Sequence, residues 1–259
     1  PTPVPSHPAR RANSLGPQSA AVMIIIGHRG SAGTAPENTL MAIAAGLKSN
    51  ADWLEIDVRL VDNQLIVIHD ELLDRTTNGS GSVYDWSFSE LRQLDAGTGE
   101  NIPVLNQALA LIDARAGLNI ELKDQQSAEP VLDAVRSALK AQPQWANRLM
   151  LSSFESDIHD KLSGEKPSEC LFGFLTKELK NTSISDAFAL GAYSINLSAR
   201  QMSPEIIEQA HRRDLKVFVY TINEFADIKR CINLGVDGIY TDYPERSAAW
   251  LRNMRPKHV

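Results

Sequence analysis

Short aliphatic runs alternate with amphipathic stretches along the chain from Met23 onward. Such alternation is typical of a parallel β-sheet covered by helices, because each buried strand is followed by a helix with one apolar face. The pattern predicts eight strands, at Met23–Gly27, Trp53–Val58, Leu118–Leu122, Leu149–Ser152, Leu171–Leu175, Tyr193–Leu197, Lys216–Thr221 and Gly238–Thr241.

Recognisable helix starts lie between the predicted strands. Pro36-Glu37-Asn38-Thr39 precedes apolar residues at helical spacing, and Ser203 is followed by Pro204 and an acid in the first turn. Eight strands in strict alternation predict an α/β fold, a (β/α)8 TIM barrel, which typically takes about 250 residues. A doubly wound open sheet is the alternative, but it usually has fewer strands, and no GxGxxG follows a strand here.

One interval interrupts this rhythm. About 45 residues separate the second strand from the helix near Leu105–Ala114, far more than a normal β–α loop contains. The interval begins with a predicted hairpin, VRLVDNQLIVIHD, that turns at Asp62-Asn63, and continues into a small insertion at about residues 70–98. In a barrel this insertion lies at the C-terminal mouth, where active sites are built.

The N-terminal residues 1–22 differ from the rest of the chain. They are rich in Pro, Ser and Ala, show no apolar periodicity and lack the apolar core of a secretory signal. We expect a disordered leader, or a segment appended for expression, ahead of a single domain at residues 23–259. A transit peptide is the competing interpretation, because Arg10 and Arg11 are present and acids are absent.

Charge and composition restrict the partners. The 259 residues include 26 basic and 32 acidic side chains, a formal charge of −6, which argues against a nucleic-acid binder held by bulk charge. No apolar run approaches the ~18 residues of a membrane span. Cys170 and Cys231 are isolated, so we expect two buried, inert thiols and a cytoplasmic location. The sequence predicts no oligomeric state.

Polar residues gather where the predicted strands end. His28 and Arg29 end the first strand, and His69 with Asp70 ends the hairpin's apolar run. Residues two apart on a strand project from the same face, opposite to their apolar neighbours. Carboxylates and a lysine at this spacing interrupt the second and third strands: Glu55, Asp57, Glu121 and Lys123. The barrel therefore brings all of them to one rim.

The residue types on this rim favour phosphate chemistry. Three neighbouring carboxylates repel one another unless a cation lies among them or their pKa values rise. Oxygen ligands suit Mg²⁺ or Ca²⁺, with Mn²⁺ a third candidate, rather than zinc. A hard cation flanked by Arg29 and Lys123 could bind phosphate, and two histidines could move the protons of P–O cleavage. Each of these residues taken alone could have a purely structural role. A solvent-exposed strand face, however, does not explain why acidic residues interrupt strands that are otherwise apolar.

Other polar residues are interpreted as structural. His159 and His211 lie in helical stretches away from the rim. Asp242, shortly before Pro244, is predicted to cap the following helix rather than to act in chemistry.

These residues, in this order, resemble the glycerophosphodiester phosphodiesterase family. The combination of HRG…PENT, ExD and HD is specific, and the similarity spans essentially the whole chain after Met23. The matching segments include GHRGSAGTAPENTLMA (27–42), LEIDVRL (54–60), VIHDELLDRTTNGSG (67–81), NIELK (119–123), VFVYTINE (217–224) and GVDGIYTDYP (235–244).

The resemblance implies a role for each rim residue. Glu55, Asp57 and Glu121 would bind a divalent cation, and His28 and His69 would be the general acid/base pair. Phosphate would be bound by Arg29 and Lys123, while Glu37 and Asn38 would order the first loop and help line the site. Tyr220 stands where the family often has Trp, so an aromatic wall is kept. The implied reaction is hydrolysis of a small glycerophosphodiester to sn-glycerol 3-phosphate and an alcohol.

Several alternatives remain at this point. The nucleophile is either water or the substrate's own glycerol hydroxyl, which would give a transient cyclic phosphate. A lysophospholipase D-type enzyme acting on lysophospholipids is the runner-up activity. A phosphoinositide-type phospholipase C also combines a barrel with two histidines, but the acidic set fits it less well. A non-catalytic phosphodiester-binding barrel is the alternative from another class of protein.

Overall fold

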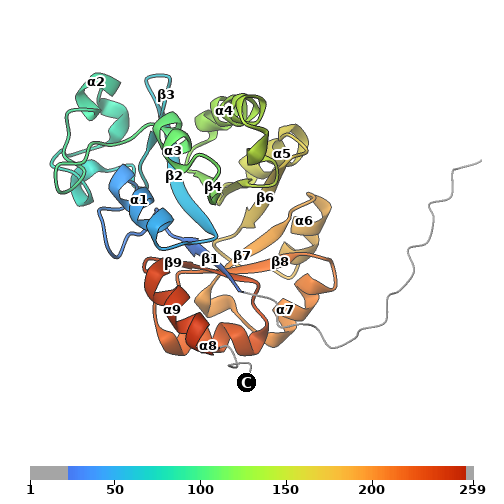
Figure 1. Cartoon of the computed structure of the whole chain (residues 1–259). Coiled ribbons are helices and arrows are strands. Elements are labelled where there is room, and N and C mark those ends of the chain that lie inside the picture. Colours follow the sequence, from blue (N-terminus) through green and yellow to red (C-terminus); the bar gives the residue numbers. More distant parts are fainter. Residues whose placement is uncertain (1–22, 255–259) are drawn as a thin grey trace, which may run out of the picture.

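The core of the molecule is a closed barrel in the computed structural model, which describes residues 23–254; the leader predicted for residues 1–22 lies outside the described residues. Within 23–254, eight parallel strands follow the order β1-β9-β8-β7-β6-β5-β4-β2, and β2 pairs with β1 (Figure 1). Their bounds are β1 Ile24–Gly27, β2 Trp53–Val61, β4 Gly117–Leu122, β5 Leu149–Ser153, β6 Cys170–Leu175, β7 Ser194–Ser198, β8 Lys216–Tyr220 and β9 Gly238–Thr241. The predicted (β/α)8 barrel is confirmed.

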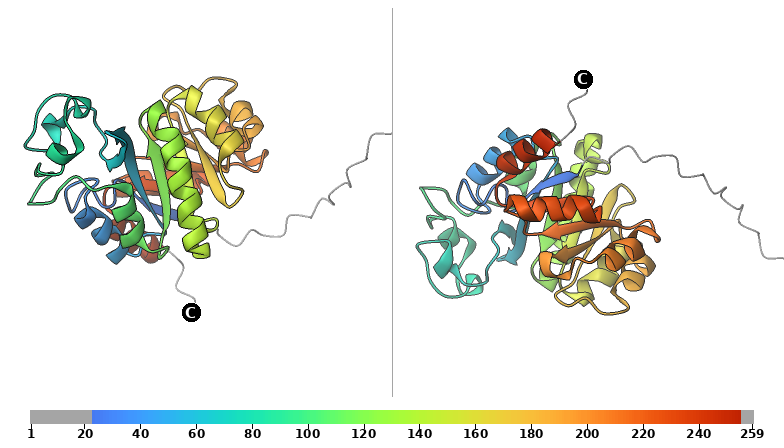
Figure 2. Two further views of the ribbon diagram at one scale, coloured as in Figure 1. Left: turned by 90° about the horizontal axis from the view of Figure 1, so that it is seen from above. Right: turned by 90° about the horizontal axis from the view of Figure 1, so that it is seen from below.

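Helices cover the outside of the barrel, as the views along two further directions show (Figure 2). They are α1 Leu40–Lys48, α3 Leu105–Ile112, α4 Ala128–Ala141, α5 Ser156–Glu165, α6 Ser183–Ala189, α7 Pro204–His211, α8 Phe225–Leu234 and α9 Pro244–Met254. Thr39 caps α1 by accepting from the Ala42 N–H, and Ser203 caps α7, so both predicted helix starts are confirmed.

Strand alternation separates the two faces of the barrel wall. Leu54 and Ile56 are fully buried in the main core beneath the helices, whereas Glu55 and Asp57 belong to the opposite face. Inside the barrel, a smaller apolar cluster is built from Ile26, Met150, Phe218 and Tyr240. The barrel interior is thus filled, and the polar strand ends lie above this filling.

The predicted hairpin follows the second strand. β3 (Gln64–Val67) pairs antiparallel with the end of β2, and the turn residues Asp62 and Asn63 have φ values of 49° and 57°. Two successive left-handed residues are what a tight two-residue hairpin requires, and Asp and Asn tolerate that conformation.

The insertion after β3 stands out to one side of the barrel in Figures 1 and 2. It contains η1 Leu73–Arg75, η2 Val83–Asp85 and the short helix α2 Phe88–Leu91. Its apolar side chains pack with residues of the β2–β3 hairpin and of the flanking chain into a core separate from the main barrel core, made of Val61, Ile66, Ile68, Leu73, Val83, Leu91, Leu94, Ala96 and Ile102. The insertion can therefore hold its own shape beside the barrel mouth.

The cysteines and the two helical histidines have the structural roles predicted for them. Cys170 and Cys231 are free and buried, and burial raises the pKa of each thiol to about 12. His159 is buried on α5 with Nε2 2.7 Å from the Ser153 carbonyl oxygen, and His211 lies on α7 beside Asp237. No helix in residues 23–254 is long and apolar enough to cross a bilayer.

A test of the insertion's separate core is the substitution Leu91→Ala. Leu91 is fully buried in that cluster, so we expect a loss of roughly 2–5 kcal/mol of unfolding free energy for the insertion. Leu72→Ala is the matched control, because Leu72 is 55% exposed and its truncation should change stability by about 0.5 kcal/mol or less. Urea unfolding, monitored by the fluorescence of Trp86 in the insertion, measures both changes in unfolding free energy. Equal losses in the two variants would contradict the separate core.

Candidate active site

The first β–α loop is folded back over the end of β1. Arg29 and Asn38 adopt left-handed backbone conformations, with φ values of 50° and 59°, which are uncommon for residues with a side chain. Gly30, at φ 84°, lies so close to α1 that an added Cβ would be 2.6 Å from the Ala42 carbonyl carbon. The Gly30 N–H donates to the Glu55 carbonyl oxygen at 3.0 Å, so β2 holds the loop in place.

Three carboxylates converge at the rim. The register of β2 against β4 places Asp57 beside Glu121, and the residue two positions earlier on β2 is Glu55. One oxygen atom from each of the three lies within 4.8 Å of the others. Glu55 and Asp57 are 2% and 1% exposed. Acidic side chains are rarely this buried without a compensating charge.

The electrostatic cost of this cluster appears in its pKa values. Burial and the neighbouring Asp57 raise the pKa of Glu55 to about 8, and burial and Asp57 also raise the pKa of Glu121. The pKa of Asp57 is lowered, because the charges of Lys123, His69 and Arg29 outweigh the opposing effect of burial. The Oε1 atom of Glu55 is buried and has no hydrogen-bond partner among the described residues. An oxygen donor set with an unpartnered buried carboxylate oxygen fits a hard divalent cation.

Two cationic side chains lie against the carboxylates. Lys123 donates from Nζ to Glu121 Oε1 at 2.5 Å, and the same Nζ is 3.3 Å from Asp57 Oδ1. Arg29 places Nε 3.4 Å from Asp57 Oδ2, while its backbone N–H donates to Glu55 Oε2 at 2.8 Å. Asn38 donates from Nδ2 to Asp57 Oδ2 and accepts from the Asp57 N–H.

His28 is paired with a carboxylate from the opposite end of the chain. Asp242 Oδ1 accepts from His28 Nδ1 at 2.7 Å, and Asp242 Oδ2 accepts from Asn223 Nδ2 at 2.6 Å. Burial lowers the pKa of His28, but the Asp242 hydrogen bond and the charge of Glu55 outweigh it, so the pKa is raised. The prediction that Asp242 caps the following helix is therefore wrong. Barrel closure between β1 and β9 brings it to His28 instead.

His69 is also paired with a carboxylate, that of the adjacent residue Asp70. Asp70 Oδ1 accepts from His69 Nδ1 at 2.5 Å, and Asp70 Oδ2 accepts from Arg75 Nε at 2.5 Å. The pKa of His69 is lowered, chiefly by burial and also by the charges of Lys123 and Arg29. Arg75 additionally binds Glu37, which in turn accepts from Arg29 Nη1 at 2.6 Å.

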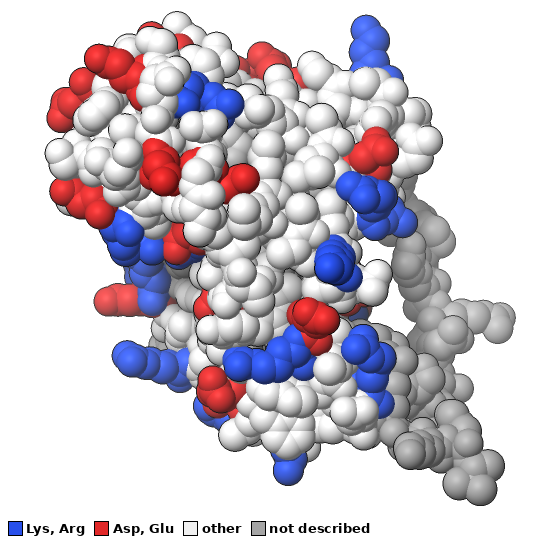
Figure 3. Space-filling view, turned by 60° about the vertical axis from the view of Figure 1, so that its left-hand side comes forward, with Lys and Arg blue, Asp and Glu red and all other residues white. Residues whose placement is uncertain are grey.

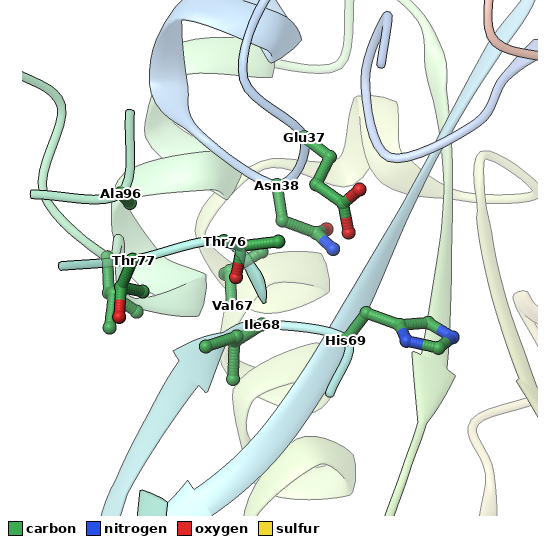
Figure 4. Close-up of a pocket in the computed structure, with 9 residues that line it drawn as sticks. Glu37, Asn38, Val67, Ile68, His69, Thr76, Thr77 and Ala96 are labelled. Atoms are coloured by element: carbon green, nitrogen blue, oxygen red, sulfur yellow. The ribbon is translucent and has the colours of Figure 1, made fainter. Parts of the chain in front are cut away.

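A cavity of about 220 Å³ joins these groups. Most of the site residues predicted from the sequence line it: His28, Arg29, Glu55, Asp57, His69, Glu121 and Tyr220. Glu37, Asn38 and Lys123 do not line it but bond to residues that do. Glu37, Asn38 and His69 also line a small pocket together with Thr76 and Thr77 of the insertion (Figure 4).

The cavity also contains residues to which the sequence analysis assigned no site role. They are Asn119, Phe154, Leu175, Thr221 and Tyr240. Asn119 is two positions before Glu121 on β4, so strand alternation alone could have placed it on the inner face. Phe154 directly follows β5 and packs edge-to-face on Tyr220, with ring centroids 5.8 Å apart. Asp242 carried no such local signal, because its partner His28 lies 214 positions away, and the link from Arg75 to Glu37 spans 38 positions.

The fold and the site define a TIM-barrel phosphodiesterase: two histidines, an acidic cluster and Arg29 line one cavity at the C-terminal mouth. Residues 28–246 match the model of the Glycerophosphoryl diester phosphodiesterase family. The chain belongs to this family, and the predicted family and enzyme class are confirmed.

Relatives and solved structures agree with this assignment. A glycerophosphodiester phosphodiesterase of Caldanaerobacter subterraneus is 34% identical over 86% of this chain and 95% of its own length. A phosphodiesterase of Oleispira antarctica, solved with the product sn-glycerol-3-phosphate, has a TM-score of 0.81 and 28% identity, covering 89% of this chain and 97% of its own. A lysophospholipase D of Rattus norvegicus is 28% identical over 88% of this chain and 86% of its own length.

The pairing of His28 with Asp242 predicts the effect of Asp242→Asn. An amide cannot stabilise the imidazolium as a carboxylate does, so the pKa of His28 should fall. NMR titration of the histidine ring resonances measures this shift, and His159, which bonds to the Ser153 carbonyl oxygen, provides an internal control that should not move. An unchanged His28 titration would show that Asp242 does not control its protonation.

Proposed function

We propose that the protein catalyses metal-dependent hydrolysis of glycerophosphodiesters to sn-glycerol 3-phosphate and an alcohol. The observation that carries this proposal is one cavity in which two aspartate-paired histidines accompany three converging carboxylates. The neighbour from Oleispira antarctica, which holds sn-glycerol-3-phosphate in the same fold, supports the product.

The acidic cluster is the proposed cation site. Glu55, Asp57 and Glu121 would hold a divalent ion, Mg²⁺ or Ca²⁺ with Mn²⁺ a third candidate, because their oxygen atoms converge and Glu55 Oε1 has no hydrogen-bond partner within residues 23–254. Such an ion would supply positive charge against the non-bridging oxygens of a phosphodiester. It would also relieve the repulsion that raises the pKa values of Glu55 and Glu121.

The chain's own residues bind and orient the phosphate. Arg29 and Lys123 lie beside the acidic cluster, where their charges can bind phosphate oxygens. Glu37 orients Arg29 through its hydrogen bond to Nη1, and Asn38 orients Asp57. Phe154 and Tyr220 form an aromatic wall on which the glycerol or alcohol part of the substrate can pack.

The two histidines are the proposed acid and base. One accepts a proton from the nucleophile, and the other donates a proton to the oxygen of the leaving alcohol. The raised pKa of His28 and the lowered pKa of His69 favour His28 as the donor. Whether water attacks directly, or the substrate's glycerol hydroxyl attacks first and water then opens a cyclic phosphate, the products are the same.

We also propose that the chain contains one catalytic domain and that the protein is located in the cytoplasm. Residues 23–254, the described part of the domain predicted at 23–259, form one catalytic domain whose insertion borders the active-site mouth, as the barrel and the separate insertion core support. The two free, buried cysteines fit a reducing cytoplasm.

The function is tested by hydrolysis of glycerophosphocholine with Mg²⁺ or Ca²⁺, measured as release of sn-glycerol 3-phosphate. His28→Ala and His69→Ala should each lower kcat by about 10²–10⁴-fold, because each removes a proton-transfer group. His211→Ala is the matched control, since His211 lies on α7 beside Asp237 and should leave kcat unchanged. Parent-level hydrolysis by both folded rim variants would rule out the acid/base pair.

Metal binding can be tested without measuring activity. Protons compete with a cation for Glu55, whose pKa is about 8. In the metal-free protein, this raised pKa makes Glu55 lower the folding stability as pH rises from 4.5 towards 8. We therefore expect Mg²⁺ or Ca²⁺ to stabilise the fold more at pH 8 than at pH 6. At a hundredfold excess over the Kd at pH 8, the stabilisation should be roughly 2–3 kcal/mol.

Thermal unfolding with and without each ion measures this stabilisation. Glu55→Gln should abolish the metal-dependent rise in Tm, whereas Glu129→Gln, at a surface acid paired with Lys161, should preserve it. A rise that survives Glu55→Gln would place the ion elsewhere.

A second candidate activity is cleavage of lysophospholipids. Leu72 and Tyr84, which are 55% and 41% exposed, lie on the insertion that borders the mouth, and could contact an acyl chain. The similarity to the lysophospholipase D of Rattus norvegicus also supports this second candidate activity. Lysophosphatidylcholine in the same assay separates the two activities: preference for it over glycerophosphocholine would favour this second candidate.

A further inference from the structure

Arg75 is one of only two basic residues in the insertion segment 70–98, and the other is Arg92. The segment also contains six acidic residues: Asp70, Glu71, Asp74, Asp85, Glu90 and Asp95. Figure 3 shows acidic side chains gathered over this part of the surface, at the upper left of the view. Arg75 ends η1 and extends from the insertion towards the barrel.

On the insertion side, Arg75 holds the partner of His69. Its Nε donates to Asp70 Oδ2 at 2.5 Å, and the other oxygen of Asp70 accepts from His69 Nδ1 at 2.5 Å. A carboxylate held at both oxygens has little freedom to rotate, so the imidazole that it binds is held in one orientation. Arg59 separately donates from Nε and Nη2 to the His69 carbonyl oxygen, which holds the backbone in place.

On the barrel side, Arg75 holds the partner of Arg29. Its Nη1 and Nη2 donate to the two oxygens of Glu37, each at 2.8 Å, in a bidentate pair. Glu37 Oε1 also accepts from Arg29 Nη1 at 2.6 Å. A continuous chain of hydrogen bonds therefore runs from His69 through Asp70, Arg75 and Glu37 to Arg29.

The seam that Arg75 crosses is tightly packed. The cavity between the insertion and the first loop is only about 10 Å³, and Glu37, Asn38, His69, Thr76 and Thr77 are among the residues that line it (Figure 4). In Figure 4 the ring of His69 points away from Thr76 and Thr77. Small shifts of the insertion at this seam would consequently move His69 relative to the first loop.

The guanidinium of Arg75 neutralises the repulsion between the two carboxylates that it binds. Arg75 faces Asp70 and Glu37, and its hydrogen bonds lower the pKa of each carboxyl, so both are ionised. Without Arg75 two negative groups would face each other across the seam. The side chain of Arg75 is 48% exposed, however, and ion pairs with this much exposure contribute little to global stability. Its effect should therefore appear in the site more than in the fold.

We propose that Arg75 is a positioning residue that couples the insertion to the first loop and so sets His69 and Arg29 relative to each other. The inference rests on the proposed function, in which His69 transfers a proton and Arg29 binds phosphate. Arg75 itself does not line the 220 Å³ cavity and acts through Asp70 and Glu37.

The primary test is steady-state hydrolysis of glycerophosphocholine by Arg75→Ala. We expect kcat to fall by about 10²-fold through His69 and KM to rise through Arg29, because small misplacements of catalytic groups are costly. Arg92→Ala is the matched control. Arg92 belongs to the same insertion and donates to the Ile102 carbonyl oxygen, without contact to the chain of site residues, so kcat and KM should remain at parent values.

Two further variants separate geometry from charge. Arg75→Lys keeps the charge but lacks the planar fork that binds Asp70 and Glu37 together, so it should resemble Arg75→Ala. Asp70→Asn should lower kcat as well, and the double variant with Arg75→Ala should lose less than the product of the two single losses. Full recovery by Arg75→Lys, or multiplicative losses in the double variant, would overturn the proposal.

A measurement without substrate keeps the two hypotheses distinct. The Nδ1 proton that His69 donates to Asp70 should give a low-field NMR resonance that disappears in Arg75→Ala and persists in Arg92→Ala. If the parent shows no hydrolysis, the proposed function fails, while this resonance still tests the positioning role. Persistence of the resonance in Arg75→Ala, or parent-level kcat and KM in that variant, would show that Arg75 does not position His69.

Discussion

The burial of three carboxylates at one end of the barrel is the constraint around which the rest of the site is arranged. Glu55, Asp57 and Glu121 are brought within 4.8 Å by the pairing of β2 with β4, a position where their mutual repulsion is weakly screened. The structure compensates in part: Lys123 and Arg29 lie against the cluster, yet the pKa of Glu55 is still raised to about 8. Three oxygen donors held this close together could hold a divalent cation.

Both histidines depend on carboxylates outside that cluster. Asp242 binds His28 and Asp70 binds His69, each through Nδ1, so among the described residues Nε2 of each ring is left for the proposed proton transfers. The two pairs come from different parts of the fold. Closure of β9 against β1 makes the first, whereas the insertion makes the second and ties it to the barrel through Arg75 and Glu37. The insertion is thus part of the site's architecture as well as a border to its mouth.

Much of the architecture was predictable because its causes are local. The strand runs, the hairpin turn at Asp62-Asn63 and the helix starts at Thr39 and Ser203 follow from short-range patterns of burial, backbone conformation and capping. Most of the site was predictable for a related reason. In a parallel barrel every strand ends at the same rim, so polar residues at strand ends must meet, whatever their separation in sequence.

The sequence by itself determined the order of strands and helices, the acidic and basic residues at the rim and the family to which the chain belongs. Tertiary structure alone decided which of those residues are partners. Asp242 looked like a helix cap because local patterns report only the nearest helix, and 214 positions separate it from His28. Arg75 likewise lies 38 positions from Glu37. Such pairings follow from barrel closure and from the docking of the insertion, which no local pattern encodes.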